Sequence, residues 1–435
     1  MVRSLGSRTL RGSAWTLGGH AAGQLIRFAN NIALTHLIAP ELIGLIAIVH
    51  VFLTGLHQLS DFGVGPAIIQ NSRGDEQSFR DTAWTLHATR GALIWLLTFP
   101  LGPLLAWIYS ADPGASHLVW LVPTVGATAL IGGLHSTAIY TLNRHLRMRP
   151  IVLLEVGSLL ICCAVSLCWA YLDPSLWALV AGVFCYQVIY TAGSHLLGTR
   201  NRLCWDRGAA AAVARFGRWI WLSTLFTWMA TQVDRLAMPA ILDFGGFAVY
   251  QTAMMIAGAV PEGAHLLGSR ILFPALAELV RRQDPTFGER LRRARILMVL
   301  PAAGVLLALS FVGEPLIRLL YPDRFHDAGW MLRLLAVAAI PQVLTASNWY
   351  ALFAMGTSFV PMCLQAAKVL LKAAGMTLGY HLGGAQGVIV GLVIAEAVHY
   401  PIVVAVWRRY GLFHPQLDVP VLLCSAIAVG ATLWT

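Results

Sequence analysis

Thirteen apolar runs occupy most of this chain, and each is long enough to cross a lipid bilayer. A membrane-spanning helix needs about 20 mostly apolar residues. Because the hydrocarbon core offers free backbone groups no partner, such segments must be helical. Hydrophobic residues make up 57% of the chain and charged residues only 11%, far from the usage of soluble domains. The sequence therefore predicts an all-α polytopic membrane protein with spans at residues 14–36, 41–58, 82–109, 116–142, 150–171, 175–197, 217–240, 244–268, 295–318, 329–354, 358–380, 384–407 and 418–434.

The loops on the two sides of the predicted membrane differ in charge. If the N-terminus is cytoplasmic, 22 of the 30 Lys and Arg residues lie on the cytoplasmic side, counting Arg218 and Arg295 at the cytoplasmic ends of their spans, and one, Arg324, lies on the other. Cytoplasmic loops are enriched in Lys and Arg, so this asymmetry places the N-terminus in the cytoplasm. The longest outer loop has about ten residues, 319–328, which leaves no room for a catalytic domain. We therefore expect no enzyme activity and no cofactor. The seven cysteines show no metal-ligand spacing, so no metal site is expected, and no large basic domain stands outside the membrane to bind nucleic acid.

The chain contains a weak internal repeat. Pro66-Ala67 follows the second span and Pro274-Ala275 follows the eighth, 208 positions later. Because six spans return a chain to its starting side, the two halves have the same orientation, and such paired lobes enclose a central cavity that opens alternately to each side. We expect an N-lobe of six spans, a cytoplasmic linker, a C-lobe of six spans and one extra span, at residues 1–197, 198–216, 217–410 and 411–435 respectively.

Charged side chains lie deep in several spans, where each costs about 2.5–3.5 kcal/mol to insert. Lys368 and Lys372, the only lysines, are four residues apart and share one helical face. Asp234 and Glu396 are deep enough to act as counter-ions or to couple transport to H⁺ or Na⁺, so the interior is expected to be net positive. The predicted substrate-binding residues are Arg27, Asn31, Arg90, Arg235, Lys368 and Lys372.

A structural interpretation competes with this one. Arg318 and Arg333 lie near span ends, where a long side chain can reach the interface or satisfy carbonyl groups between helices. For Arg90, closer to the cytoplasmic side, the structural and functional interpretations are equally favoured. Arg27 and the two lysines are too deep to reach the interface easily, which favours a hydrated cavity around them.

A cationic cavity in the membrane favours an anionic cargo, and a phosphate or diphosphate can satisfy several Lys and Arg side chains at once. A lateral opening to lipid would suit a cargo with a polar head and an acyl or prenyl tail. An anion that moves outward travels down an inside-negative potential, which is worth about 2.3 kcal/mol per charge per 100 mV.

Two stretches of the sequence resemble a known family. Pro40-Glu41-Leu42-Ile43-Gly44, then Asp61-Phe62-Gly63-Val64-Gly65-Pro66-Ala67, and later Val233-Asp234-Arg235-Leu236 are similar to the polysaccharide-transporter, Wzx-type branch of the multidrug/oligosaccharidyl-lipid/polysaccharide (MOP) flippase superfamily. The resemblance implies a MATE-like fold of two six-helix bundles with alternating access, in a bacterial inner membrane. It implies an undecaprenyl-pyrophosphate-linked oligosaccharide as cargo, for O-antigen, capsule or exopolysaccharide. A polysaccharide polymerase and chain-length proteins are candidate partners.

Three other functions remain open at this point. A peptidoglycan lipid-precursor flippase has nearly the same chemistry. A multidrug antiporter of the same superfamily would favour an anionic cavity, whereas this one is expected to be cationic. A membrane polysaccharide polymerase or ligase would need a larger outer loop.

Overall fold

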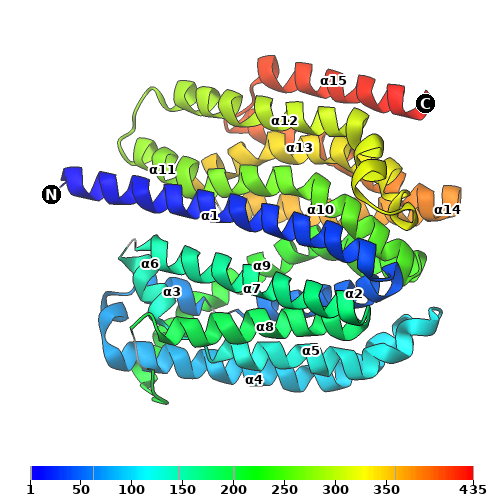
Figure 1. The fold of residues 1–435 in the computed structure, drawn as a ribbon. Helices are drawn as coiled ribbons and strands as arrows, with labels where there is room; N and C mark the ends of the chain where they lie inside the picture. The colour runs from blue at the N-terminus through cyan, green and yellow to red at the C-terminus, as the bar shows by residue number, and fades with distance from the viewer. Residues whose placement is uncertain (1, 62, 146, 199–200, 358, 435) are drawn as a thin grey trace. The chain divides into compact units, whose positions relative to one another are not determined.

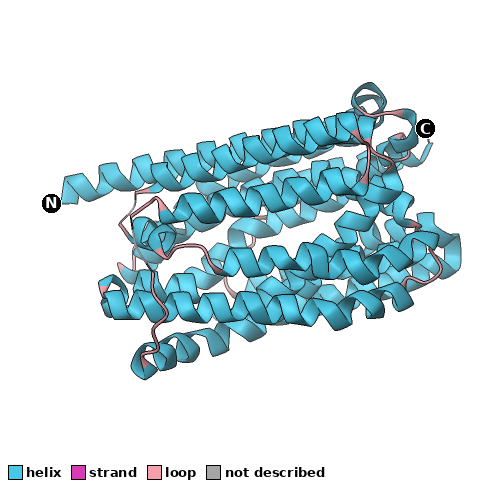
Figure 2. Cartoon of the chain, turned by 60° about the horizontal axis from the view of Figure 1, so that its bottom comes forward, coloured by secondary structure: helices cyan, strands magenta, loops and turns pink. Residues whose placement is uncertain are grey.

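The computed structural model describes residues 2–61, 63–145, 147–198, 201–357 and 359–434. Throughout these residues the regular structure is helical and no strand occurs, as Figures 1 and 2 show. In this described part, eight helices are long and apolar enough to span a membrane, judged by length and composition. The predicted fold class, an all-α polytopic membrane protein, is confirmed.

The long helices follow the predicted apolar runs. Short helices and turns connect them: α3 (Val64–Gln70), η1 (Ser72–Asp75), η2 (Pro113–His117), α6 (Ala138–Arg144), η3 (Gly268–Leu272), α11 (Phe273–Arg281) and η4 (Asp323–Phe325). The long helices are α1 (Val2–Leu37), α2 (Pro40–Leu59), α4 (Gln77–Ile108), α5 (Leu118–Gly133), α7 (Met148–Leu172), α8 (Leu176–His195), α9 (Arg207–Ile241), α10 (Phe244–Leu267), α12 (Phe287–Leu320), α13 (Ala328–Ala354), α14 (Phe359–Arg409) and α15 (Pro415–Trp434).

One predicted span is too long. The run 116–142 was expected to be a single helix, but α5 ends at Gly133 and α6 begins at Ala138. Side chains of other helices satisfy the carbonyl groups at this break. The Trp84 indole donates to the Leu134 carbonyl at 3.2 Å, and His195 Nε2 lies 2.9 Å from the same oxygen. Such partners from distant segments cannot be recognised in the apolar run itself.

The fold of α14 is a helical hairpin rather than one straight rod. Its backbone leaves the helical region at Gly383 and at Gly384, where φ is 59°, a conformation that favours glycine. The two arms correspond to the predicted spans 358–380 and 384–407.

The chain divides into two compact units. The first contains residues 1–228 and 243–245, and the second contains residues 229–242 and 246–435. In the first unit α4 packs against α5, α7 against α8, and α1 against α7. In the second unit α13 packs against α11, α12, α14 and α15.

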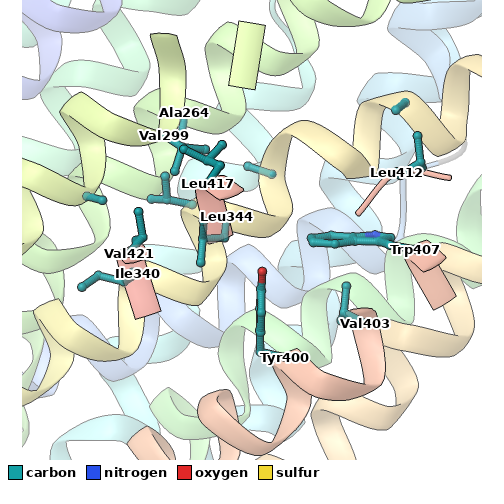
Figure 3. Packing of buried hydrophobic residues seen from close by; sticks show 14 of the residues in the cluster. Ala264, Val299, Ile340, Leu344, Tyr400, Val403, Trp407, Leu412, Leu417 and Val421 are labelled. Carbon is teal, nitrogen blue, oxygen red and sulfur yellow. The ribbon is translucent and has the colours of Figure 1, made fainter. Parts of the chain in front are cut away.

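Helix α13 forms the centre of the second unit. Within the 32 residues Asp323–Ala354 that contain it, 72% of the most apolar window is buried, more than in any other described span. Figure 3 shows Ile340 and Leu344 of α13 beside Tyr400 and Trp407 of α14, with Leu417 and Val421 from α15 in the same cluster. This core includes residues of α14, the helix that carries the lysine pair, and so fixes the position of that helix.

Candidate functional site

Close contact between glycines sets the distance between the two arms of α14. A Cβ atom at Gly379 would lie 2.1 Å from the Gly387 carbonyl oxygen, and one at Gly391 would lie 2.0 Å from that of Gly375. Only glycine permits this approach. The glycines are four residues apart on each arm, so they form a small-residue face of the kind through which membrane helices pack closely. The packing places Lys372, three residues before Gly375, near Glu396 on the opposite arm.

The two lysines share Glu396. The Lys368 ammonium lies 2.8 Å from Glu396 Oε1, and the Lys372 ammonium lies 3.8 Å from the same oxygen. Gln342 of α13 also donates to this oxygen, at 3.2 Å. A buried carboxylate between two ammonium groups is therefore the central feature of the site.

Asp234 completes the cluster from α9. Its Oδ1 atom lies 3.7 Å from the Lys372 ammonium, and its Oδ2 atom accepts a hydrogen bond from the Tyr250 hydroxyl at 2.7 Å. Asp234 is 2% exposed and Glu396 is 4% exposed, so neither carboxylate is solvated. Buried charges are tolerated when they are paired and hydrogen-bonded, which explains why two lysines accompany two acidic residues here.

A small cavity of about 50 Å³ opens beside this cluster. Its polar lining consists of Asp234, Tyr250, Gln342, Lys372 and Glu396, and apolar residues of α10, α13 and α14 form the rest. The space is large enough for a water molecule, and the polar groups could hold one or two. A cavity with room for water therefore lies next to charges in the interior of the second unit.

The structure thus brings together four of the predicted residues: Asp234, Lys368, Lys372 and Glu396. The formal charges of these four residues cancel, so the lysine pair alone does not make this region net positive. The sequence had suggested a net positive interior. Arg235, the next residue after Asp234, adds one positive charge and donates to Gln232 at 3.5 Å.

The remaining predicted residues belong to the first unit. Arg27 is exposed on α1 and donates to Gln24 at 3.3 Å, and Asn31, one turn later, is half-buried. Arg90 has structural partners: it donates to the Ser60 hydroxyl at 2.9 Å and to the His57 carbonyl, and it lies 3.7 Å from Asp61. It therefore binds the C-terminal end of α2, and a role in cargo binding stays a prediction for all three residues.

The arginines near span ends form the contacts expected of structural residues. Arg318 and Arg333 both contact Glu314, at 2.7 and 3.1 Å. His399 is 6% exposed, and its Nε2 atom lies 3.0 Å from the Leu364 carbonyl oxygen.

Sequence reasoning missed a second buried ion pair. Arg295 of α12 and Asp418 of α15 are both fully buried and lie 2.7 Å apart. Arg295 also contacts Ser347 at 3.1 Å and lies over the Trp407 ring. Each partner lies at the very edge of an apolar run, so both resemble interfacial residues in the sequence.

The described residues contain no group of three or more His, Cys, Asp or Glu side chains placed to hold a metal ion.

Comparison with known proteins identifies the family. Residues 33–329, more than half of the chain, match the family described as polysaccharide biosynthesis protein. The chain belongs to this family. It is 22% identical to the lipopolysaccharide biosynthesis protein WzxC of Escherichia coli strain K12. The alignment is 447 residues long and covers 99% of this chain and 89% of that protein. The resemblance that the sequence motifs predicted is confirmed.

Two solved structures share the fold of this polysaccharide biosynthesis family member. An inward-facing multidrug resistance MATE family transporter of the MOP superfamily matches with a TM-score of 0.72 and 15% identity, covering 90% of this chain and 94% of that one. The lipid II flippase MurJ, in an inward closed conformation, matches with a TM-score of 0.72 and 11% identity, covering 98% of this chain and 92% of that one. The MATE-like fold is therefore confirmed, and the protein is a multi-pass membrane protein.

Proposed function

We propose that this protein is a flippase that moves a polyprenyl-pyrophosphate-linked oligosaccharide, of the undecaprenyl type, from the inner to the outer leaflet of the bacterial cytoplasmic membrane. The cargo would be a repeat unit for a surface polysaccharide such as O-antigen, capsule or exopolysaccharide. Family membership, the match to WzxC over nearly the whole chain and the fold shared with a lipid II flippase support this function. The observation that carries it is the pair of lysines, Lys372 buried and Lys368 partly buried, that share one carboxylate.

The shared carboxylate gives the lysines a route to bind an anionic headgroup. Glu396 Oε1 lies within 4 Å of both ammonium groups, so a single oxygen serves two cations. A diphosphate carries several charged oxygens and can contact both ammonium groups at once, which makes it a stronger partner for the pair than one carboxylate. Lys368, whose side chain is 15% exposed, is the more accessible of the two and would meet the headgroup first.

Binding of the headgroup would release Glu396 from its partners. An unpaired buried carboxylate is costly, so it would take up a proton or a sodium ion, while Asp234 keeps the Tyr250 hydroxyl. This exchange makes H⁺ or Na⁺ the candidate coupling ion. With the N-terminus in the cytoplasm, outward movement of the anion is also driven by the membrane potential, by about 2.3 kcal/mol per charge per 100 mV.

In this proposal Arg27, Asn31, Arg90 and Arg235 are further cargo contacts, and the protein carries out no covalent chemistry. Multidrug cation antiport is less favoured because Lys368 and Lys372 neutralise the two carboxylates that would attract a cationic drug.

The test uses charge-balanced variants. Lys368→Gln alone would leave Glu396 with a weaker partner, whereas Lys368→Gln combined with Glu396→Gln removes one charge of each sign. We expect the balanced double variant to fold and to lose transport of polyprenyl-pyrophosphate oligosaccharide in proteoliposomes. Arg318→Gln, which changes an exposed pair near a span end, is the matched control and should transport normally.

In cells, loss of the protein should cause prenyl-linked glycan to accumulate on the inner leaflet. Transport at the wild-type rate by the balanced double variant would refute the role of the lysine pair. Normal surface polysaccharide in cells that lack the protein would refute the function itself.

A further inference from the structure

A second cavity lies on the surface of the second unit, between the cytoplasmic end of α12 in the proposed orientation and the start of α15. Its volume is about 510 Å³, ten times that of the cavity beside Glu396. Ile296 and Leu300 of α12 form one wall, and Leu417, Pro420 and Val421 of α15 form the other. Ile296 is 37% exposed and Leu300 is 48% exposed, so this groove is open at the outer surface of α12 and α15.

One end of the groove is cationic. Arg292 lies four residues before Ile296 on the same face of α12, and His414 lies next to the first residue of α15. The groove therefore has the polarity of an amphiphile, with a positive end at the headgroup level and an apolar length that continues into the hydrocarbon.

Arg292 differs from its neighbours on α12 in having no acidic partner among the described residues. On the same helix Arg290 lies 3.8 Å from Asp284, Arg293 lies 2.5 Å from Glu289, and Arg295 lies 2.7 Å from Asp418. Among the described residues, Arg292 alone of the α12 arginines forms no ion pair. A guanidinium that is exposed, unpaired and at the mouth of an apolar groove is suited to bind an anionic oxygen.

His414 adds a polar group but little charge at neutral pH. Burial, together with the Arg295 guanidinium 3.1 Å from its Nδ1 atom, lowers the pKa of His414 below its ordinary value. Arg292 is therefore the main source of positive charge at the groove.

From this groove and its unpaired guanidinium we infer a binding site for an anionic phospholipid of the bilayer, with the phosphate at Arg292 and one acyl chain between α12 and α15. Basic pockets between membrane helices recognise lipid headgroups in this way. None of the groove residues lines the cavity beside Glu396, so this site is separate from the one proposed for the cargo. A lipid here would bridge α15 to α12 and would stabilise their contact by binding only the folded protein.

The headgroup is tested by native mass spectrometry of the purified full chain, titrated with phosphatidylglycerol and, separately, with phosphatidylcholine. We expect tighter binding of phosphatidylglycerol, and Arg292→Gln should weaken it about five- to tenfold, the effect of one cation near a membrane surface or one charge-assisted contact. Arg293→Gln, whose side chain is paired with Glu289, is the matched control and should leave binding unchanged. Equal binding of both lipids, or equal loss in both variants, would overturn the proposal.

The acyl chain is tested with a substitution that fills the groove. Leu300→Trp should reduce phosphatidylglycerol binding, whereas Leu297→Trp, at a position 77% exposed and outside the groove, should not. If an undecaprenyl phosphate displaces phosphatidylglycerol from this site at equal concentration, the groove is a cargo site and the assignment to phospholipid is wrong. Because binding is measured without transport, failure of the flippase proposal leaves this test unaffected.

Discussion

The shared carboxylate at Glu396 makes a quantitative prediction about stability. Glu396→Gln keeps an oxygen that can accept from Gln342 but removes the negative charge between Lys368 and Lys372. At an effective dielectric constant of about 20, the attractions lost are about 6 kcal/mol at 2.8 Å and about 4 kcal/mol at 3.8 Å. The carboxylate no longer has to be desolvated, so we expect a net loss of about 3–5 kcal/mol, the range for breaking a buried pair.

The combination Lys368→Gln/Glu396→Gln separates this effect from packing. It removes one charge of each sign and leaves Lys372 with Asp234, so its stability should lie within about 1–2 kcal/mol of wild type. The assay is unfolding of the purified protein in detergent or lipid, with the coupling energy obtained from a double-mutant cycle. If the Glu396→Gln protein is as stable as wild type, or if the effects of the two substitutions simply add, the side chains do not interact as the structure shows.

Three further predictions concern contacts that hold the helices together. Gly379→Leu should destabilise the α14 hairpin by about 1–3 kcal/mol or more, because its Cβ atom would meet the Gly387 carbonyl oxygen. Gly383→Ala is the control and should be tolerated, since no atom lies within 4 Å of the added Cβ. Thermal unfolding of the two variants compares their stabilities. Asp418→Asn should lower the free energy of unfolding by about 3–5 kcal/mol, because Arg295 loses its buried acidic partner. Arg293→Gln breaks an exposed pair and should lower it by less than about 1 kcal/mol. Equal losses for the two variants in denaturant unfolding would count against a buried ion pair. Arg90→Gln should weaken the attachment of α2 to α4, because Arg90 bonds the Ser60 hydroxyl and the His57 carbonyl. The expected result is faster amide hydrogen exchange around Ser60. Unchanged exchange would show that these contacts do not stabilise the end of α2.

Much of the fold could be predicted because a bilayer restricts what an apolar run can do. The long runs had to be helical, and all but 116–142 follow the predicted spans. The depth of Lys368, Lys372, Asp234 and Glu396 followed from their positions within the runs. The need for counter-ions also followed, since a bare charge is costly at that depth.

The pairing itself could not be predicted because it depends on how helices pack. The sequence contains Gly375 and Gly379, then Gly387 and Gly391, each pair four residues apart, and this spacing is the one signal for close packing within the hairpin. No comparable signal links Arg295 to Asp418, which are far apart in the chain and lie at span edges. The partners of Arg90, at the end of α2, are equally absent from its own span.

The paired cluster of Lys368, Lys372, Asp234 and Glu396 would suit transport of an anion better than unpaired lysines. A cavity with fixed, unpaired lysines would bind a diphosphate tightly and release it slowly, whereas a transporter must also let its cargo go. In the proposed mechanism Glu396, which lies within 4 Å of both ammonium groups, would compete with the cargo for them, so the cost of displacing it would be subtracted from the affinity for the cargo. When the headgroup leaves, the carboxylate can return at once, and no buried cation is left unpaired. Replacing Glu396 with Gln should therefore lower the rate of release more than the rate of binding, which single-turnover measurements on the fraction that folds would reveal.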